Sequence, residues 1–450
     1  MAQRFSCSAC GFNAAKWFGR CPDCAAWSSA TAPVTGAALE IVRLSDAGAS
    51  PERIASGIRE FDRVLGGGIV AGSVILLAGE PGIGKSTLVL EALAELGRNG
   101  RDCLLITGEE SLAQIASRAT RLEIDTGVLH VASSSSLRAV VTALDEQRPR
   151  SDVLVIDSIQ TLQDDSIDQT PGSSTQVRHS AAHLVEIAKR TGTAIVLVGH
   201  VTKEGSVAGP KTLEHMVDTV LTLDGERSGT LRLLRAVKNR FGPCDETGVF
   251  VMGERGLEPV PDPSAMFLED RRDGVPGSVA FPALDGTRPL LVEIQALVTD
   301  ATAPQPRRVT IGLDARRFML VAGVILEHGG ISLAGKDAFV AAAGGLKVRE
   351  PACDLAIALA CRSAVKEDPI DPSLVAIGEL GLGGEVRRIQ GVERRLAEAA
   401  RMGFERAVVP RGNATARADI EVVPVSHLGE AFEAGAIRNS LYAVPPPARA

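Results

Sequence analysis

Short aliphatic runs alternate with longer amphipathic runs through the first half of the chain. Four of the aliphatic runs read as buried strands: residues 74–78, 103–107, 153–157 and 194–199. Runs with apolar residues at helical spacing lie between and after them: residues 86–97, 111–121, 137–146 and 176–191. This alternation predicts a mainly parallel sheet with helices on both faces. Three later runs, separated by turn residues, predict strands that extend the sheet: residues 219–223, 230–238 and 248–252.

The pattern changes at the proline-rich segment 259–263, after which strands and helices are mixed. The strands predicted there are residues 277–282, 290–298, 375–378 and 406–409. The helices predicted there are residues 316–327, 353–364 and 391–401. We therefore expect a second, α+β domain after the first, α/β domain. The predicted divisions are a small lobe at 1–30, a linker at 31–50, a first large domain at 51–262, a second at 263–438 and a disordered tail at 439–450.

The composition of the chain indicates a globular protein but does not identify its binding partner. With 45% hydrophobic and 23% charged residues, the 450-residue chain is globular. Aromatic residues make up only 3%, so extended base-stacking platforms are not expected, and any nucleic-acid contact should be mainly to phosphate. The net charge of −7 leaves the partner open, because a ring or channel can concentrate positive charge locally. No signal peptide or membrane span is apparent, and we expect a cytoplasmic protein.

Four of the eight cysteines form two Cys-x-x-Cys pairs near the N-terminus: Cys7, Cys10, Cys21 and Cys24. Each pair points two thiolates at one centre, and four thiolates suit a closed tetrahedral Zn²⁺ site. The segment is too short to build its own core, which favours the metal over four incidental thiols. We expect Trp17 and Trp27 to pack around this lobe rather than to stack on bases; alternatively, an exposed Trp17 could dock a partner.

Residues 79–86, Gly-Glu-Pro-Gly-Ile-Gly-Lys-Ser, join a predicted strand to a predicted helix. These are the letters and the context of a phosphate-binding P-loop. The glycines let backbone N–H groups face the phosphates, Lys85 reaches the β- and γ-phosphate oxygens, and Ser86 can bind Mg²⁺ at the helix N-terminus. The predicted nucleotide-binding residues are Gly79, Glu80, Pro81, Gly82, Ile83, Gly84, Lys85, Ser86 and Thr87.

Acidic residues at the ends of two other predicted strands complete the hydrolytic chemistry. Asp157 ends the run 153–157, where it would face the metal directly or through water. Many P-loop ATPases place the water-orienting Glu directly after this Asp, but here the residue is Ser158. The base must therefore come from elsewhere. We favour Glu109 over Glu110; alternatively, the pair is an exposed acidic start to the next helix.

Two further groups of polar residues follow predicted strands. His200 ends the run 194–199 and precedes a lysine-bearing loop, so it could sense the γ-phosphate, although a histidine taken by itself is more often structural. Lys238 and Arg240 end another run and could pair with acidic neighbours or reach phosphate. Spacing alone does not decide between these alternatives.

Taken in order, these motifs resemble the RadA/Sms family of bacterial recombination and repair ATPases, which are related to RecA and to DnaB-type helicases. The resemblance spans nearly the whole chain and rests on the four cysteines, the P-loop with Thr87, the segment 108–111, Asp157-Ser158, the segment 200–205 and Lys238-Asn239-Arg240-Phe241-Gly242. It implies a zinc finger and a RecA-like core that binds ATP and Mg²⁺ at the interfaces of a homo-hexameric ring. It also implies single-stranded DNA in the centre, contacted by Lys203 and Lys211, and a role for Lys238 and Arg240 on the neighbouring nucleotide, on DNA, or on both.

The second domain resembles the proteolytic domain of Lon, which uses a Ser–Lys dyad. Aligning the two places Ala352 at the nucleophile position and Glu393 at the lysine position. Without nucleophile and base, peptidase chemistry by that mechanism is not expected, and Cys353 is read as a structural thiol. The domain is interpreted as a ring-forming scaffold whose candidate contacts to duplex DNA are Lys347, Arg349, Arg387 and Arg388.

The leading hypothesis is an ATP-driven DNA helicase of homologous recombination and repair. It would translocate on single-stranded DNA, act on branched DNA to promote branch migration, and cooperate with a RecA-type recombinase. The alternative is an ATP-gated DNA-binding or loading scaffold that does not translocate.

Overall fold

In the computed structural model of the chain, the described residues are 5–8, 10, 12–14, 16–28, 30–31, 43, 52–146, 151–200, 213–225 and 229–436. They form two compact units, residues 1–51 and 52–450. The predicted tail at 439–450 and nearly all of the predicted linker lie outside the described residues. The finer division at residues 262 and 263 stays a prediction.

The N-terminal unit is a small antiparallel sheet built around the cysteine pairs. Its strands are β1 (Phe5–Cys7), β2 (Asn13–Ala14) and β3 (Ala30–Thr31), in the order β2-β1-β3. A backbone hydrogen bond closes a turn at each pair: Cys7 N–H donates to Phe12 and Cys21 N–H to Ala26, both at 2.8 Å. These turns bring the two pairs of thiols toward one point.

The expected packing of the two tryptophans in this unit is wrong. Trp17 is 64% exposed and Trp27 is 73% exposed. The Arg20 guanidinium lies over the Trp27 ring, 5.7 Å from its centroid, and the Phe12 and Phe18 rings meet edge to face instead. A lobe this small has too little interior to bury an indole, so the two phenylalanines and the cysteines fill it.

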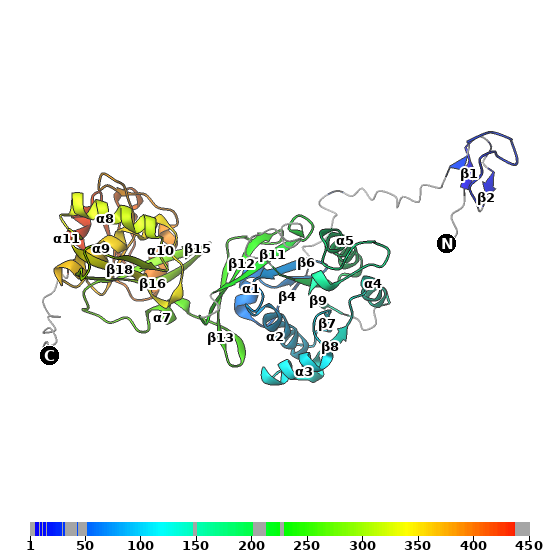
Figure 1. The fold of residues 1–450 in the computed structure, drawn as a ribbon, viewed down its shortest axis with the longest axis horizontal. Coiled ribbons are helices and arrows are strands. Elements are labelled where there is room, and N and C mark those ends of the chain that lie inside the picture. The colour runs from blue at the N-terminus through cyan, green and yellow to red at the C-terminus, as the bar shows by residue number, and fades with distance from the viewer. Residues whose placement is uncertain are drawn as a thin grey trace. The chain divides into compact units, whose positions relative to one another are not determined.

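The second unit begins with a nine-stranded sheet in the order β14-β13-β12-β11-β6-β10-β9-β7-β8 (Figure 1). The six strands β11, β6, β10, β9, β7 and β8 are parallel to one another. Strands β12, β13 and β14 continue the sheet beyond β11, each antiparallel to its neighbour. The strands are β6 (Val74–Gly79), β7 (Cys103–Thr107), β8 (His130–Ser133), β9 (Val153–Asp157), β10 (Ala194–His200), β11 (Thr219–Gly225), β12 (Leu231–Asn239), β13 (Thr247–Gly253) and β14 (Gly256–Pro259). The helices are α1 (Arg59–Leu65), α2 (Lys85–Arg98), α3 (Leu112–Arg121), α4 (Leu137–Asp145) and α5 (Ser174–Thr191).

Helices cover both faces of this sheet, as the sequence pattern predicts. Successive residues of a strand point to opposite faces, and along β6 Ile75 joins a core cluster with α1 and α2, whereas Leu76 joins a cluster with α4 and α5. Every residue of β6 is buried. The carboxyl ends of the parallel strands therefore form one edge at which polar side chains converge.

A seven-stranded mixed sheet follows, in the order β17-β18-β16-β15-β19-β22-β23. Its strands are β15 (Ser278–Asp285), β16 (Arg288–Asp300), β17 (Arg308–Ile311), β18 (Lys336–Ala342), β19 (Leu374–Ala376), β22 (Arg406–Pro410) and β23 (Glu421–Val425). Its helices are α7 (Pro263–Leu268), α8 (Ala315–Gly329), α9 (Asp354–Lys366), α10 (Val392–Arg401) and α11 (Leu428–Ala434). The predicted α/β core and α+β second domain are both present.

The tip of the β15–β16 hairpin contacts the first sheet through buried charge. The Arg288 guanidinium pairs with Glu60 on α1, and Glu60 also accepts a hydrogen bond from Val249 N–H at 2.8 Å. Arg235 on β12 donates to both oxygens of Asp285, at 2.7 and 2.5 Å. These ion pairs join the second sheet to α1 and to β12 of the first sheet.

Candidate functional site

The loop between β6 and α2 has the backbone geometry of a phosphate cradle. Gly82 and Gly84 take φ values of 79° and 115°, in the left-handed region that favours glycine. The loop leads into the N-terminus of α2, a 14-residue helix with no acidic residue in its first turn. An anion is therefore favoured at this helix end, both by the dipole and by the unpaired N–H groups.

Lys85, the first residue of α2, is buried beneath this loop. Its ammonium group donates to the carbonyls of Gly79 at 2.9 Å and Glu80 at 3.0 Å, and lies 3.2 Å from Nδ1 of His200. Burial lowers the pKa of Lys85, and the charges of Asp157 and Glu109 oppose that shift. A buried cation next to the cradle is suited to hold phosphate oxygens.

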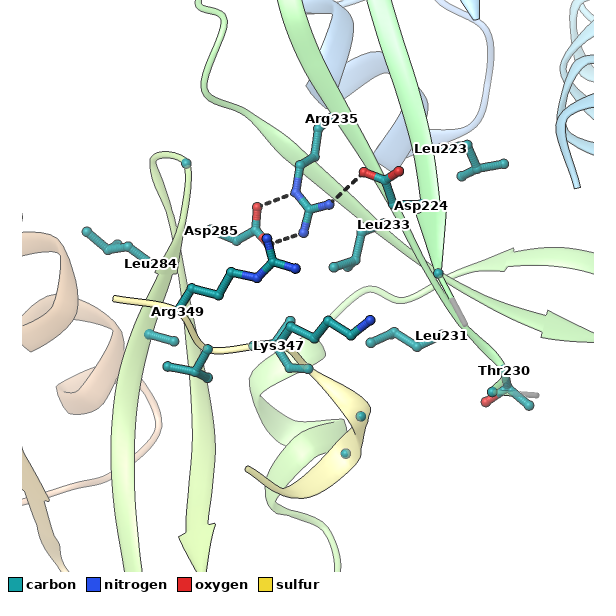
Figure 2. A pocket seen from close by; sticks show the side chains of 18 of the residues that line it. Leu223, Asp224, Thr230, Leu231, Leu233, Arg235, Leu284, Asp285, Lys347 and Arg349 are labelled. Carbon is teal, nitrogen blue, oxygen red and sulfur yellow. Dashed lines mark hydrogen bonds and ion pairs between the residues drawn. The ribbon is translucent and has the colours of Figure 1, made fainter. Parts of the chain in front are cut away.

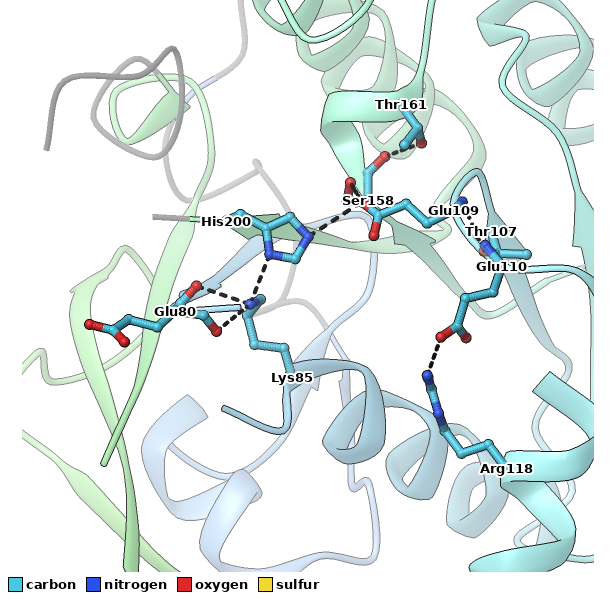
Figure 3. A network of polar contacts seen from close by, with 10 residues as sticks. Glu80, Lys85, Thr107, Glu109, Glu110, Arg118, Ser158, Thr161 and His200 are labelled. Atoms are coloured by element: carbon cyan, nitrogen blue, oxygen red, sulfur yellow. Dashed lines mark hydrogen bonds and ion pairs between the residues drawn. The ribbon is translucent and has the colours of Figure 1, made fainter. Parts of the chain in front are cut away.

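His200 is brought to the P-loop by strand register, because it pairs with Gly79 at the ends of β10 and β6. Its Nε2 lies 3.3 Å from Oε1 of Glu109, so the imidazole bridges Lys85 and Glu109 (Figure 3). A neutral ring with its proton on Nε2 satisfies both contacts: Nδ1 accepts from the ammonium group and Nε2–H donates to the carboxylate. We assign that tautomer from the hydrogen bonds.

The two consecutive glutamates after β7 have different surroundings. Glu109 contacts His200 and accepts a hydrogen bond from the Ser158 hydroxyl at 2.5 Å. Glu110 instead pairs with Arg118 on α3, on the other side of the strand end (Figure 3). The structure therefore brings Glu109, and not Glu110, to the buried lysine.

Asp157 ends β9, between β10 and β7, and faces the first turn of α2. Burial raises the pKa of Asp157, and a hydrogen bond with the Ser86 side chain opposes the rise. A hydroxyl and a carboxylate are oxygen donors of the kind that Mg²⁺ takes alongside phosphate oxygens and water. The two side chains thus fit the predicted magnesium site.

Lys238 and Arg240 lie away from this site, at the opposite edge of the sheet. In the sheet, Lys238 on β12 lies opposite Val220 on β11, and Val220 lies opposite Leu76 on β6. Leu76 is three residues before Gly79. The Lys238 ammonium group donates to the carbonyls of Glu214 and Val217, at 2.5 and 2.7 Å.

Arg240 contacts Asp218 at 3.1 Å, and its side chain is half exposed. Burial lowers the pKa of Lys238, and the neighbouring Arg240 adds to that shift. Neither cation is directed at the P-loop of its own chain.

The four N-terminal cysteines form the metal-ligand cluster found among the described residues, with all four Sγ atoms within 4.8 Å of one another. Cys7 and Cys24 are 3.6 Å apart, as are Cys10 and Cys21. A tetrahedral zinc ion with Zn–S bonds of about 2.3 Å separates its sulfurs by about 3.8 Å. The cluster fits Zn²⁺ closely.

Comparison with protein families assigns three parts of the chain. Residues 5–30 match the family described as "Rubredoxin metal binding domain", residues 40–206 match "AAA domain", and residues 325–413 match "Subunit ChlI of Mg-chelatase". The first match covers the four cysteines. The second covers the P-loop, Glu109, Asp157 and His200, and indicates a nucleotide-hydrolysing core.

Curated relatives match over almost the full length. The chain is 46% identical over 446 residues to the DNA repair protein RadA of Pseudomonas aeruginosa, covering 96% of this chain and 98% of the relative. It is 44% identical over 448 residues to RadA of Bacillus subtilis, covering 95% and 97%, and 43% identical to RadA of Listeria monocytogenes, covering 96% and 97%. The chain belongs to the RadA family. The predicted family and fold class are confirmed.

In this RadA-family chain, the residues at the two predicted Lon-like positions differ in exposure. Ala352 is buried, whereas Glu393 is exposed in the first turn of α10. The Cys353 thiol is buried and donates to the Glu350 carbonyl at 3.1 Å. Burial and the neighbouring acidic groups raise the pKa of Cys353, which disfavours its thiolate form.

A cavity of about 930 Å³ opens between the P-loop and the second sheet. Glu80 and Ile83 line one side, and Lys347 and Arg349 line the other. Between them, Arg235 bridges Asp285 and Asp224 (Figure 2). The predicted contacts Lys347 and Arg349 therefore lie in a cleft that reaches the nucleotide loop.

The described residues do not test several of the predictions made from the sequence. Lys203 and Lys211 lie outside the described residues, and the roles of the predicted site residues stay predictions. Arg387 pairs with Glu385. None of the helices in the described ranges has both the length and the hydropathy needed to cross a membrane.

The sequence does not predict one contact of the site, the hydrogen bond between Ser158 and Glu109, because Ser158 stands out in the sequence only as a position that lacks a base. Its hydrogen bond to Glu109 is the new feature. The available signal is register: Asp157 would lie beside Thr107 in neighbouring parallel strands, so the residues that follow them would meet.

Proposed function

We propose that this chain is an ATP-driven DNA motor of recombination and repair that translocates on single-stranded DNA as a homo-hexameric ring. It would promote branch migration of branched DNA together with a RecA-type recombinase. One observation carries the proposal: Lys85, His200 and Glu109 form a continuous polar network at the P-loop. The names of the relatives, which are DNA repair proteins, supply the setting.

In the proposed hydrolysis, the backbone of the P-loop and Lys85 bind the β- and γ-phosphates. Ser86 and Asp157 hold Mg²⁺, which would neutralise charge on the phosphate oxygens when bound. Glu109 accepts the proton of the attacking water. His200 lies between the phosphate-binding lysine and this base, where it can report the γ-phosphate to the loop that follows β10.

The position of Lys238 and Arg240 supports a ring. Three residues of strand place Lys238 about 10 Å from the level of Gly79, toward the other edge of the sheet. In a head-to-tail assembly, that edge of one copy can face the P-loop edge of the next. Lys238 and Arg240 would then act on the nucleotide of the neighbouring copy, on DNA, or on both.

The second sheet is proposed as the scaffold of the ring rather than a peptidase. Ala352 supplies no nucleophile, and the buried Cys353 thiol does not replace it. Lys347 and Arg349, which are exposed in the cleft beside the P-loop, are the proposed DNA contacts of this domain, and Lys203 and Lys211 are those of the central loop.

A Lys85→Ala variant tests the nucleotide assignment. We expect DNA-stimulated ATP hydrolysis to fall to background, because Lys85 supplies the buried ammonium group next to the phosphate cradle, whereas the other buried cation there, Arg232, donates to the Ile83 carbonyl. Hydrolysis and unwinding of forked DNA should be lost together. Full ATP hydrolysis in the purified variant would refute the assignment, and hydrolysis by the unchanged protein without unwinding would favour a loading scaffold instead.

A further inference from the structure

Ser158 occupies the position directly after the metal-side Asp157 and is completely buried. Its hydroxyl donates to Oε1 of Glu109 at 2.5 Å, across the gap between the ends of β9 and β7. A hydrogen bond from a hydroxyl to a carboxylate is among the stronger kinds in proteins. Ser158, at the position where many P-loop ATPases place the base, is thus the residue that donates to Glu109.

The turn that carries Ser158 is itself fixed. The Ser158 carbonyl accepts from the Thr161 hydroxyl at 2.7 Å and from the Thr161 N–H at 3.2 Å. Gly108 N–H, directly before Glu109, donates to the Asp157 carbonyl at 3.0 Å. A Cβ on Gly108 would lie 2.0 Å from the Thr161 hydroxyl, so only glycine allows this close docking. The donor and the carboxylate are therefore attached to two segments that are locked together.

The two oxygens of Glu109 are not equivalent. Both donors, the Ser158 hydroxyl and Nε2 of His200, contact Oε1 (Figure 3). Within the described part of the chain, Oε2 makes no hydrogen bond, and the side chain as a whole is 43% exposed. One oxygen is held by two donors, whereas the other has no such restraint and belongs to a side chain that is nearly half exposed.

We propose that Ser158 is a positioning residue for ATP hydrolysis: it anchors Oε1 of Glu109 so that Oε2 is presented to the attacking water. The inference rests on the proposed function, in which Glu109 is the base. Ser158 touches neither nucleotide nor water in this account. It acts by restricting the orientation of the Glu109 carboxylate, so its loss should slow the chemical step and leave nucleotide binding intact.

The test measures ATP hydrolysis and nucleotide affinity in a Ser158→Ala variant of the full chain. We expect kcat to fall roughly 10- to 100-fold, the range for losing a hydrogen bond to a charged group, with KM for ATP within about twofold of the unchanged protein. Ser158→Thr, which keeps the hydroxyl, should recover a large part of kcat. Ser111→Ala is the matched control, because it removes a serine hydrogen bond at the start of α3 that does not involve Glu109.

Three outcomes would overturn the inference. Unchanged kcat in Ser158→Ala would do so, as would an equal loss of kcat in Ser111→Ala. So would losses of ATP affinity and thermal stability in step with kcat and without recovery in Ser158→Thr, since they would show a structural role. Full hydrolysis in Glu109→Gln would contradict the proposed function itself, whatever Ser158→Ala does.

Discussion

The polar network at the P-loop allows a charged lysine to remain buried. Lys85 exchanges water for two carbonyls and one imidazole nitrogen, which saturates its three N–H donors. Phosphate oxygens would have to replace some of these acceptors. His200 is one of these acceptors, and its replacement would change the partner of His200 and, through it, that of Glu109.

The neighbouring glutamates give a matched pair of variants. We expect Glu109→Gln to lower the kcat of ATP hydrolysis by roughly 10²- to 10⁴-fold, the usual contribution of a general base. Glu110→Gln should change kcat by less than about threefold, because it loses only a partly exposed ion pair with Arg118. Steady-state ATP hydrolysis with single-stranded DNA measures both. Equal losses in the two variants would contradict the assignment of the base.

At this scale the sequence predicts much of the site. The P-loop, Asp157 and His200 follow from motifs and from the rule that carboxyl ends of parallel strands meet at one edge. The choice between Glu109 and Glu110 depends on the direction in which each side chain points. Arg118, which pairs with Glu110, lies eight residues further along the chain, so this pairing is not apparent from the neighbouring sequence. The exposure of Trp17 and Trp27 was missed because composition does not show how little interior the lobe has.

At the scale of elements, α2 links the P-loop to the β13–β14 hairpin. Glu91, on the second turn of α2, accepts from Leu257 N–H at 3.0 Å, and its other oxygen is buried without a hydrogen-bond partner in the described chain. Burial raises the pKa of Glu91 from its ordinary value of 4.5 to about 7, and the charge of Glu258 adds to the shift. The folded protein therefore holds this proton more tightly than the unfolded chain does.

This proton makes stability depend on pH. The protonated Glu91 carboxyl group contributes to the free energy of unfolding. This contribution is fully present below about pH 4.5 and is lost as the pH rises through about 7. Glu91→Gln should thus be more stable than the unchanged protein at pH 8 by about 1–2 kcal/mol, after allowance for partial exposure, and should show no gain at pH 5. Thermal unfolding at the two pH values measures this.

Glu95→Gln, one turn further along α2 in an exposed pair with Arg98, is the control. It should not alter the pH dependence. The same response in both variants would assign the effect to the net charge of the helix instead of to the buried carboxyl group.

The predictable elements are those with long, wholly buried or clearly amphipathic runs. β6, β9 and β10 lie where the aliphatic runs place them. Within the two large sheets, the strands that were not predicted lie at or next to the edges: β8, β14, β17, β18 and β23. Edge strands such as β8 and β17 have no fully buried residue, so they lack the continuous apolar signal on which the prediction depends. Short helices such as α1 and α11 offer too few turns to show a periodicity.

At the scale of the whole molecule, the zinc lobe and the rest of the chain are separate compact units. We expect Cys21→Ser to abolish zinc binding, because a tetrahedral site needs all four thiolates, and to leave the thermal transition of residues 52–450 unchanged. Metal analysis and calorimetry measure the two effects. Cys244→Ser, which alters an exposed cysteine outside the cluster, should keep its zinc. A shared loss of stability in both units would contradict their independence.

The nucleotide site of one chain is incomplete in this account. The P-loop, Glu109 and His200 lie at one edge of the sheet, while Lys238 and Arg240 are held at the other by Asp218 and by the carbonyls of Glu214 and Val217. A cyclic arrangement of identical copies brings unlike edges together at every interface. The site would then be shared between neighbours.

Mixing two inactive variants tests whether the nucleotide site is shared between neighbouring copies. Lys85→Ala and Arg240→Ala should each lose DNA-stimulated ATP hydrolysis when purified alone. In assemblies formed from an equal mixture, about a quarter of the interfaces would combine an intact P-loop with an intact Arg240 from the neighbour. We expect ATP hydrolysis to reappear in the mixture, up to about a quarter of that of the unchanged protein. A dilution series of the unchanged protein with Lys85→Ala gives the reference for inhibition by inactive copies. If hydrolysis in the mixture stays at the level of the separate variants while the diluted reference remains active, the site is not shared between copies.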